Sequence, residues 1–146
     1  MESNRQTAIP AGLQFAALVR QRIGDILARE MHDDGMMHLY HTGAYWTAFE
    51  HSAYRLASLC PYTRVTPLLV RGIPRAIVTA CITDSLLASA TRGLAHTTDT
   101  QHERAYRMTR PTDTEGYSHW HRQQTGIIEG VALSVRNAYR PTVSYD

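Results

Sequence analysis

The chain has 146 residues, of which 43% are apolar, and its formal net charge is only +2. This length fits one domain with a hydrophobic core, and so small a charge does not by itself indicate a nucleic-acid-binding protein. No stretch approaches the roughly 20 apolar residues that cross a bilayer, and the first residues lack the apolar core of a signal peptide. We therefore expect a single cytoplasmic domain, residues 1–146, with no membrane partner.

The first half of the chain predicts a helix, a hairpin and a second helix. After about ten residues that we expect to be flexible, apolar residues recur at helical spacing as far as a turn at 32–35. The run MMHLYH is typical of a strand, HTG of a turn, and AYWTAF of a second strand that pairs with the first. A helix over residues 50–59 follows and ends before Pro61.

The next segment predicts a strand and a third helix. The strand lies in TRVTPLLVRG, and Pro67 assigns it to a sheet edge because proline has no N–H for the ladder. Gly72-Ile73-Pro74 is predicted to be a turn that begins a helix, which Gly93 ends. The apolar face of that helix would consist of Ile77, Val78, Cys81, Ile82, Leu86 and Leu87.

The last segment predicts two short strands, in GLAHTTDT and HERAYRMTR, then a helix over about 116–140 and a loose tail, RPTVSYD. Helices and strands that alternate in this way favour an α/β fold, in which a mixed β-sheet is flanked by helices.

Two residue types add to this outline. All 15 basic residues are arginine, which binds phosphate through two hydrogen bonds and stacks on base rings. A GC-rich genome would produce the same bias through its codons, so both explanations stay open. The two cysteines, Cys60 and Cys81, lie in apolar segments without a C-x-x-C spacing, and we predict that both are buried free thiols.

Two short motifs occur in the order found in a known family. The first is GAYWTAF, Gly43 to Phe49, before an alanine-bearing helix, and the second is RGIP, Arg71 to Pro74, before the next predicted helix. With these motifs, residues 13–112 resemble the N-terminal, mismatch-recognition domain of the MutS DNA mismatch repair proteins, as a divergent stand-alone domain. The resemblance implies the fold of that domain, with a C-terminal helix over about 116–140 added.

The resemblance also implies contact with DNA. In the family, a phenylalanine stacks on the mispaired base and a glutamate two residues later hydrogen-bonds to it. Tyr45 occupies the stacking position here, and Thr47 replaces the glutamate with a shorter hydroxyl. Trp46 lies on the opposite face of the same strand, and Arg64 and Arg71 flank the next strand, where they are candidates for phosphate contacts.

The alternative for these residues is structural: both rings pack within the protein and the arginines are only solvated. The chain has no lysine and no G-x-x-x-x-G-K-[S/T] loop, so we expect no counterpart of the family's ATPase.

Catalysis and metal binding find little support in the sequence. No serine has a G-x-S-x-G elbow and neither cysteine has a histidine at a diagnostic distance, so we expect no catalytic residue and no cofactor. The eight histidines show no recognised ligand spacing, so we expect no metal. His96 and His102, with Asp99 and Glu103, remain a loose alternative.

We therefore predict a non-enzymatic DNA-binding or DNA-associated module that resembles the MutS mismatch-recognition domain without the ATPase. The alternative is a protein-interaction or scaffold domain that retains the fold without binding DNA, with the C-terminal helix forming a homodimer or binding a protein partner. A third hypothesis is a hydrolase with a site around His96 and His102.

Overall fold

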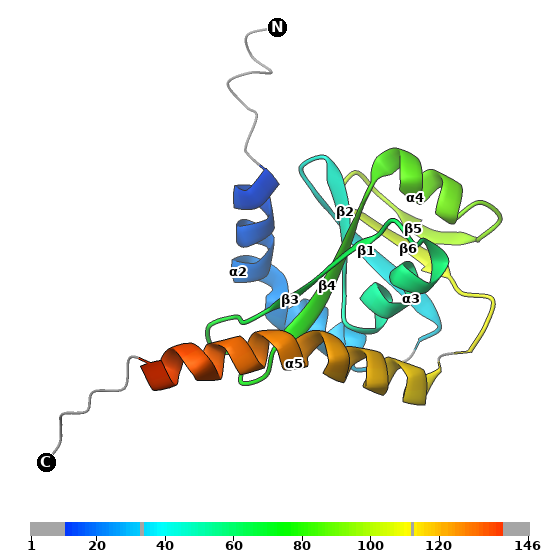
Figure 1. The fold of residues 1–146 in the computed structure, drawn as a ribbon. Coiled ribbons are helices and arrows are strands. Elements are labelled where there is room, and N and C mark those ends of the chain that lie inside the picture. The colour runs from blue at the N-terminus through cyan, green and yellow to red at the C-terminus, as the bar shows by residue number, and fades with distance from the viewer. Residues whose placement is uncertain (1–10, 33, 112, 139–146) are drawn as a thin grey trace, which may run out of the picture.

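The computed structural model describes residues 11–32, 34–111 and 113–138, and Figure 1 shows how its elements are arranged. The expected flexible start and the expected loose tail over 140–146 lie outside these residues. In chain order, the elements are α2 (Ala11–Glu30), β1 (Met36–Thr42), β2 (Tyr45–Phe49), α3 (His51–Leu59), β3 (Arg64–Leu68), β4 (Ile77–Thr83), α4 (Asp84–Ala90), β5 (His96–Asp99), β6 (Glu103–Arg107) and α5 (Thr114–Ala138).

The strands form one six-stranded sheet in the order β3-β4-β2-β1-β6-β5, and each of its pairings is antiparallel. Helices packed on a sheet confirm the predicted α/β class, but the predicted mixture of parallel and antiparallel strands is wrong. Three pairings join strands that follow one another through a short loop, and a parallel pair would need a crossover of a dozen or more residues.

The predicted hairpin is confirmed. Thr42 pairs with Tyr45, so the connection is a two-residue turn of Gly43 and Ala44. Gly43 has φ 67°, which glycine adopts without the strain that other residues would suffer. The backbone N–H of Gly43 also donates to Oε1 of Gln14 at 2.6 Å, which ties the hairpin tip to the first turn of α2.

The predicted helix after Gly72 is wrong in its first half, because Ile77–Thr83 forms the strand β4. This strand lies between β3 and β2, and the residues from Ile77 to Ala80 are all buried. A strand covered on both faces carries apolar residues on both, so it lacks alternation and imitates a helical pattern. The helix α4 begins only at Asp84, where Leu86 N–H donates to the Thr83 hydroxyl at 3.4 Å.

The two faces of the sheet are covered unequally, as Figure 1 shows. α3, α4 and α5 pack on one face, here called the covered face, while α2 alone packs on the other, here called the α2 face. The core of the covered face includes Met37, Leu39, Trp46, Ala48, Leu56, Ala80, Ile82, Leu87 and Tyr106. The smaller cluster beneath α2 is built on Ile26, Tyr40, Phe49 and Ile77.

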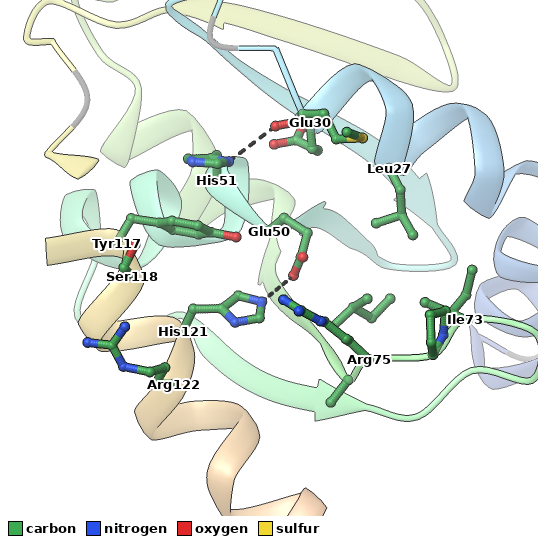
Figure 2. Close-up of a pocket in the computed structure, with 14 residues that line it drawn as sticks. Leu27, Glu30, Glu50, His51, Ile73, Arg75, Tyr117, Ser118, His121 and Arg122 are labelled. Carbon is green, nitrogen blue, oxygen red and sulfur yellow. Dashed lines mark hydrogen bonds and ion pairs between the residues drawn. The ribbon is translucent and has the colours of Figure 1, made fainter. Parts of the chain in front are cut away.

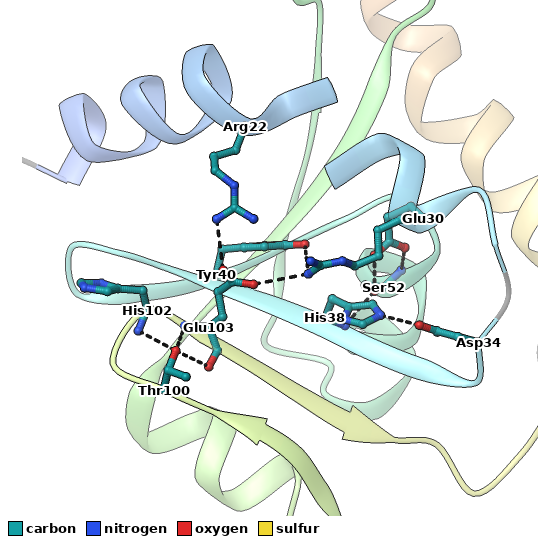
Figure 3. Close-up of polar contacts among 10 residues, drawn as sticks. Arg22, Glu30, Asp34, His38, Tyr40, Ser52, Thr100, His102 and Glu103 are labelled. Atoms are coloured by element: carbon teal, nitrogen blue, oxygen red, sulfur yellow. Dashed lines mark hydrogen bonds and ion pairs between the residues drawn. The ribbon is translucent and has the colours of Figure 1, made fainter. Parts of the chain in front are cut away.

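Charged groups hold α2 to the sheet (Figure 3). Arg22 and Arg29 both form ion pairs with the Glu103 carboxylate of β6, at 3.1 and 3.3 Å, and Arg29 also donates to the Tyr40 hydroxyl at 3.0 Å. These two arginines therefore serve the fold.

None of the helices in the described part of the chain combines the length and the apolar character required to cross a membrane.

Candidate nucleic-acid interface

One helix cannot cover the whole α2 face, and the part nearest β3 stays open to solvent. Strand register places Arg64 opposite Cys81, and Tyr45 opposite Thr83, so their side chains share this face. Tyr45, Arg64 and Thr66 are exposed, and Cys81 and Thr83 are partly exposed. We call these five residues the open surface.

Tyr45 is the aromatic member of the open surface. It is the first residue of β2, directly after the hairpin turn, and 42% of it is exposed. Part of Tyr45 is therefore accessible to a ligand. Two strand spacings and two residue steps separate Tyr45 from Arg64, which places their Cα atoms about 12 Å apart.

Trp46, a predicted contact residue, points to the covered face and is only 3% exposed. Its indole N–H donates to Oδ1 of Asp84 at 3.0 Å, and the Arg104 guanidinium lies 4.3 Å from its ring centroid. Trp46 therefore belongs to the core, and we do not include it in the interface. The prediction that the Tyr45 and Trp46 rings lie on opposite faces is confirmed.

Thr47, the second predicted contact, is 2% exposed on the α2 face, where its hydroxyl hydrogen-bonds to the Thr42 hydroxyl at 2.9 Å. It forms the floor of a hollow of about 250 Å³ beneath the first turns of α2. The rim of this hollow includes Tyr45 and Phe15. Thr47 therefore shapes the surface beside Tyr45, while its hydroxyl is already hydrogen-bonded within the protein.

Arginines dominate the edge of the sheet beside this surface. Residues 51–83 contain four arginines and no aspartate or glutamate. Arg55 is buried and donates to the Met36 carbonyl, whereas Arg64, on the edge strand β3, and Arg71, in the β3–β4 loop, are exposed. Neither Arg64 nor Arg71 forms an ion pair with a residue that the structure describes.

A second hollow, of about 530 Å³, adjoins the first between α2 and the β3–β4 loop. Arg20 and Arg71 stand at its rim, and Leu69 beside them is 52% exposed. Its apolar lining consists of Phe15, Ala16, Val19, Ile23, Leu68, Leu69 and Val70. This groove offers a mainly apolar surface beside the candidate interface.

Cys81 corrects the prediction that both thiols are buried. Both cysteines are free, but only Cys60 is buried, within the core of the covered face, whereas Cys81 is partly exposed on the open surface. Burial raises the pKa of the Cys81 thiol, and the nearby Arg64 guanidinium acts in the opposite direction.

A group of titratable residues that the sequence did not predict gathers at the other end of α2, where His121 of α5 meets Glu50 and His51 meets Tyr117 (Figure 2). Tyr117 and His121 are four residues apart and so share one side of α5. That spacing places only these two side chains together, because Glu50 and His51 come from a distant segment of the chain.

The structure gives little support to the alternative site around His96 and His102. The His96 ring packs edge-on against Tyr106, with ring centroids 4.6 Å apart, and His102 is exposed in the β5–β6 turn. No three histidine, cysteine or acidic side chains in the described residues are grouped closely enough to hold a metal ion.

Comparisons with known proteins matched no family model, no curated protein and no solved structure.

Proposed function

We propose that this protein is a non-enzymatic DNA-binding module that holds unpaired bases on its open surface. The observation that carries the proposal is that the exposed ring of Tyr45 shares one sheet face with the exposed guanidinium of Arg64. Aromatic rings and arginines on an open sheet are the elements that bind single strands, because every base has a face for stacking and every linkage has a phosphate.

The geometry favours unpaired over paired DNA. A duplex hides its base faces within the stack, whereas a single strand or a mismatch releases them at a cost of a few kcal/mol or less. Stacking on Tyr45 would contribute about 1–3 kcal/mol. Arg64 and Arg71 are exposed on a segment without acids, so no carboxylate within residues 51–83 competes for their charge.

Fluorescence anisotropy with labelled single-stranded, mismatched and matched DNA at low salt tests the proposal. We expect the single strand to bind best and the matched duplex least. Two phosphate contacts on a single strand would give a slope of about −1.4 in log K against log salt concentration. Binding no stronger than that of an unrelated neutral protein would refute the proposal.

Substitutions then locate the interface. Tyr45→Ala should weaken binding about 5- to 150-fold, whereas Tyr45→Phe keeps the stacking face and should bind almost as well as the wild type. Arg64→Ala should reduce both the affinity and the salt slope. Arg92→Ala is the matched control, because Arg92 is an exposed arginine in the turn after α4. Equal affinity for Tyr45→Ala and the wild type would remove Tyr45 from the interface.

A protein-interaction role is the second candidate, and the apolar groove beside Arg20 and Arg71 favours it. A groove of about 530 Å³ with the half-exposed Leu69 at its edge suits an apolar side chain of a partner. Light scattering over a range of protein concentrations tests self-association, and Leu69→Asp should abolish it. A monomer at every concentration, together with DNA binding, would favour the first proposal.

A further inference from the structure

A cleft of about 570 Å³ lies beside the Glu50–His121 pair, at the C-terminal end of α2 (Figure 2). It lies between the end of α2, the start of α3, the β3–β4 loop and the first turns of α5. One wall is apolar, with Leu27, Met31, Ile73, Pro74 and Ile77. The cleft is separate from the open surface, because Tyr45 lies near the N-terminal end of the same helix.

Two carboxylates line the cleft, and both already have partners. Glu30 is 5% exposed, and its two oxygens accept hydrogen bonds from the Ser52 N–H at 2.9 Å and the Ser52 hydroxyl at 2.6 Å. Oε1 of Glu50 accepts the Val78 N–H at 2.8 Å and lies 2.8 Å from Nε2 of His121. The acids of the cleft therefore serve mainly to hold its walls together.

The backbone conformation and hydrogen bonds of Glu50 fix the position of its carboxylate in the cleft. Glu50 has φ 54°, the only positive φ among the described residues other than glycine, and such a conformation persists only where its surroundings hold it. Glu50 N–H donates to the Val78 carbonyl at 2.9 Å while the Glu50 carboxylate accepts from Val78 N–H. The carboxylate thus stands where a strand carbonyl would be, and it is fixed before any ligand arrives.

Two donors in the cleft remain unused. The Tyr117 ring stacks on His51, with centroids 3.7 Å apart, and Figure 2 shows its hydroxyl directed into the cleft, where it meets no hydrogen-bond partner among the described residues. Burial raises the pKa of Tyr117 above its usual value, so the phenol keeps its proton. Arg75 is exposed in the β3–β4 loop, forms no ion pair with a described residue, and extends toward the Glu50–His121 pair.

We propose that this cleft binds a small monocarboxylate with an apolar body, whose carboxylate takes the hydrogen bonds of Arg75 and Tyr117. The apolar body lies against the wall that includes Leu27 and Ile77. An arginine beside a phenol recognises a carboxylate through charge-assisted hydrogen bonds. A phosphate dianion is less suited, because the Glu50 carboxylate lines the same cleft and repels a second negative charge.

Nuclear magnetic resonance titration of the intact chain with benzoate and hexanoate tests this inference. We expect saturable shifts of the backbone amide signals of Ile73, of residues 75–77 and of residues 117–122 at millimolar concentrations. Benzylamine tests whether the site prefers a cation, and inorganic phosphate tests whether charge alone suffices. Stronger binding of either comparator than of the carboxylates, or no saturable shift with benzoate and hexanoate, would overturn the proposal.

Matched variants separate the roles of the two donors. Arg75→Ala should weaken benzoate binding about tenfold or more, and Tyr117→Phe, which keeps the stack on His51, about fivefold. Arg92→Ala should leave the affinity unchanged. Arg75 is exposed, so its loss leaves the fold intact, and unchanged benzoate affinity in Arg75→Ala would contradict the proposal. Because Tyr45 and Arg64 lie outside the cleft, DNA binding succeeds or fails independently.

Discussion

The two faces of the sheet differ in how completely helices cover them. On the covered face, three helices bury a continuous core, whereas on the α2 face a single helix leaves β3 and part of β4 accessible. Neighbouring residues of β4 show the difference in exposure between the two faces. Ala80 is fully buried on the covered face, and Cys81 is partly exposed on the α2 face. Substitutions in the core of the covered face should therefore cost more stability than substitutions at the exposed positions of the open surface, where we propose that DNA binds.

Leu56→Ala should have the largest effect on stability. Leu56 of α3 is fully buried in the covered face, so its truncation loses apolar burial and leaves a cavity, at a cost of about 2–5 kcal/mol. Thr66→Ala, at an exposed position on the open surface, should change stability by no more than about 0.5 kcal/mol. Urea unfolding followed by circular dichroism measures both, and equal effects would erase the distinction between the faces.

Glu30 joins the two faces, because it ends α2 and accepts the hydrogen bonds of Ser52 at the start of α3. Burial raises the pKa of Glu30 from 4.5 to about 7, against the opposing effects of Ser52 and Arg55. The folded protein therefore retains a proton that the unfolded chain releases. Stability should fall as pH rises from about 4.5 to about 7, by at most about 3 kcal/mol.

Glu30→Gln tests this pH dependence, since an amide resembles the protonated acid and keeps an oxygen for the Ser52 N–H. The variant should be more stable than the wild type at pH 8 and equally stable at pH 4. Unfolding curves at several pH values give the difference. The pKa values of Asp34 and Glu103 are lowered, so these two groups affect stability only at more acidic pH. Their effect is the same in the wild type and in Glu30→Gln. Parallel pH profiles for the two proteins would refute the raised pKa.

Local patterns in the sequence predicted much of this division, but not all of it. Gly43 between two aromatic-rich runs predicted the hairpin, and Pro67 predicted the edge strand, because each residue restricts its own backbone. The strand β4 was mistaken for a helix because its first four residues, Ile77 to Ala80, are buried on both faces, and that burial depends on strands and helices far away in the sequence. The propensities of the residues in one segment do not reveal contacts with distant segments.

The candidate sites divide in the same way. The alternation of Tyr45 and Trp46 followed from strand geometry alone, although which ring would be exposed depended on where the helices pack. The cleft was not predicted, because Glu30, Glu50, Arg75 and Tyr117 come from four separate segments and only the fold assembles them.

The hydrogen bond between Asp84 and Trp46 lies at the margin of the covered face, and substitutions of Asp84 test its contribution to stability. The Asp84 carboxylate accepts the hydrogen bond of the buried Trp46 indole, and its loss would leave that N–H without an acceptor, at a cost of about 1–2 kcal/mol. Asp84→Ala should therefore lower stability and alter the fluorescence of Trp46. Asp84→Asn keeps an oxygen at the same place and should resemble the wild type. Similar losses in the two variants would instead assign the effect to the charge of Asp84.

The reactivity of the two thiols compares the accessibility of the two faces without altering the stability of the protein. Cys60 is buried beneath the covered face and Cys81 is partly exposed on the open surface, so iodoacetamide should modify only Cys81 in the folded protein and both in urea. The raised pKa of Cys81 keeps it mostly protonated, so at pH 8 it should react more slowly than a free thiol. Arg64→Ala should slow the reaction further, because the guanidinium favours the thiolate.

Mass spectrometry of each thiol gives the rates of modification. Single-stranded DNA should protect Cys81 from iodoacetamide if the DNA occupies the open surface. Equal rates for Cys60 and Cys81 in the folded state would show that the α2 face is no more open than the other.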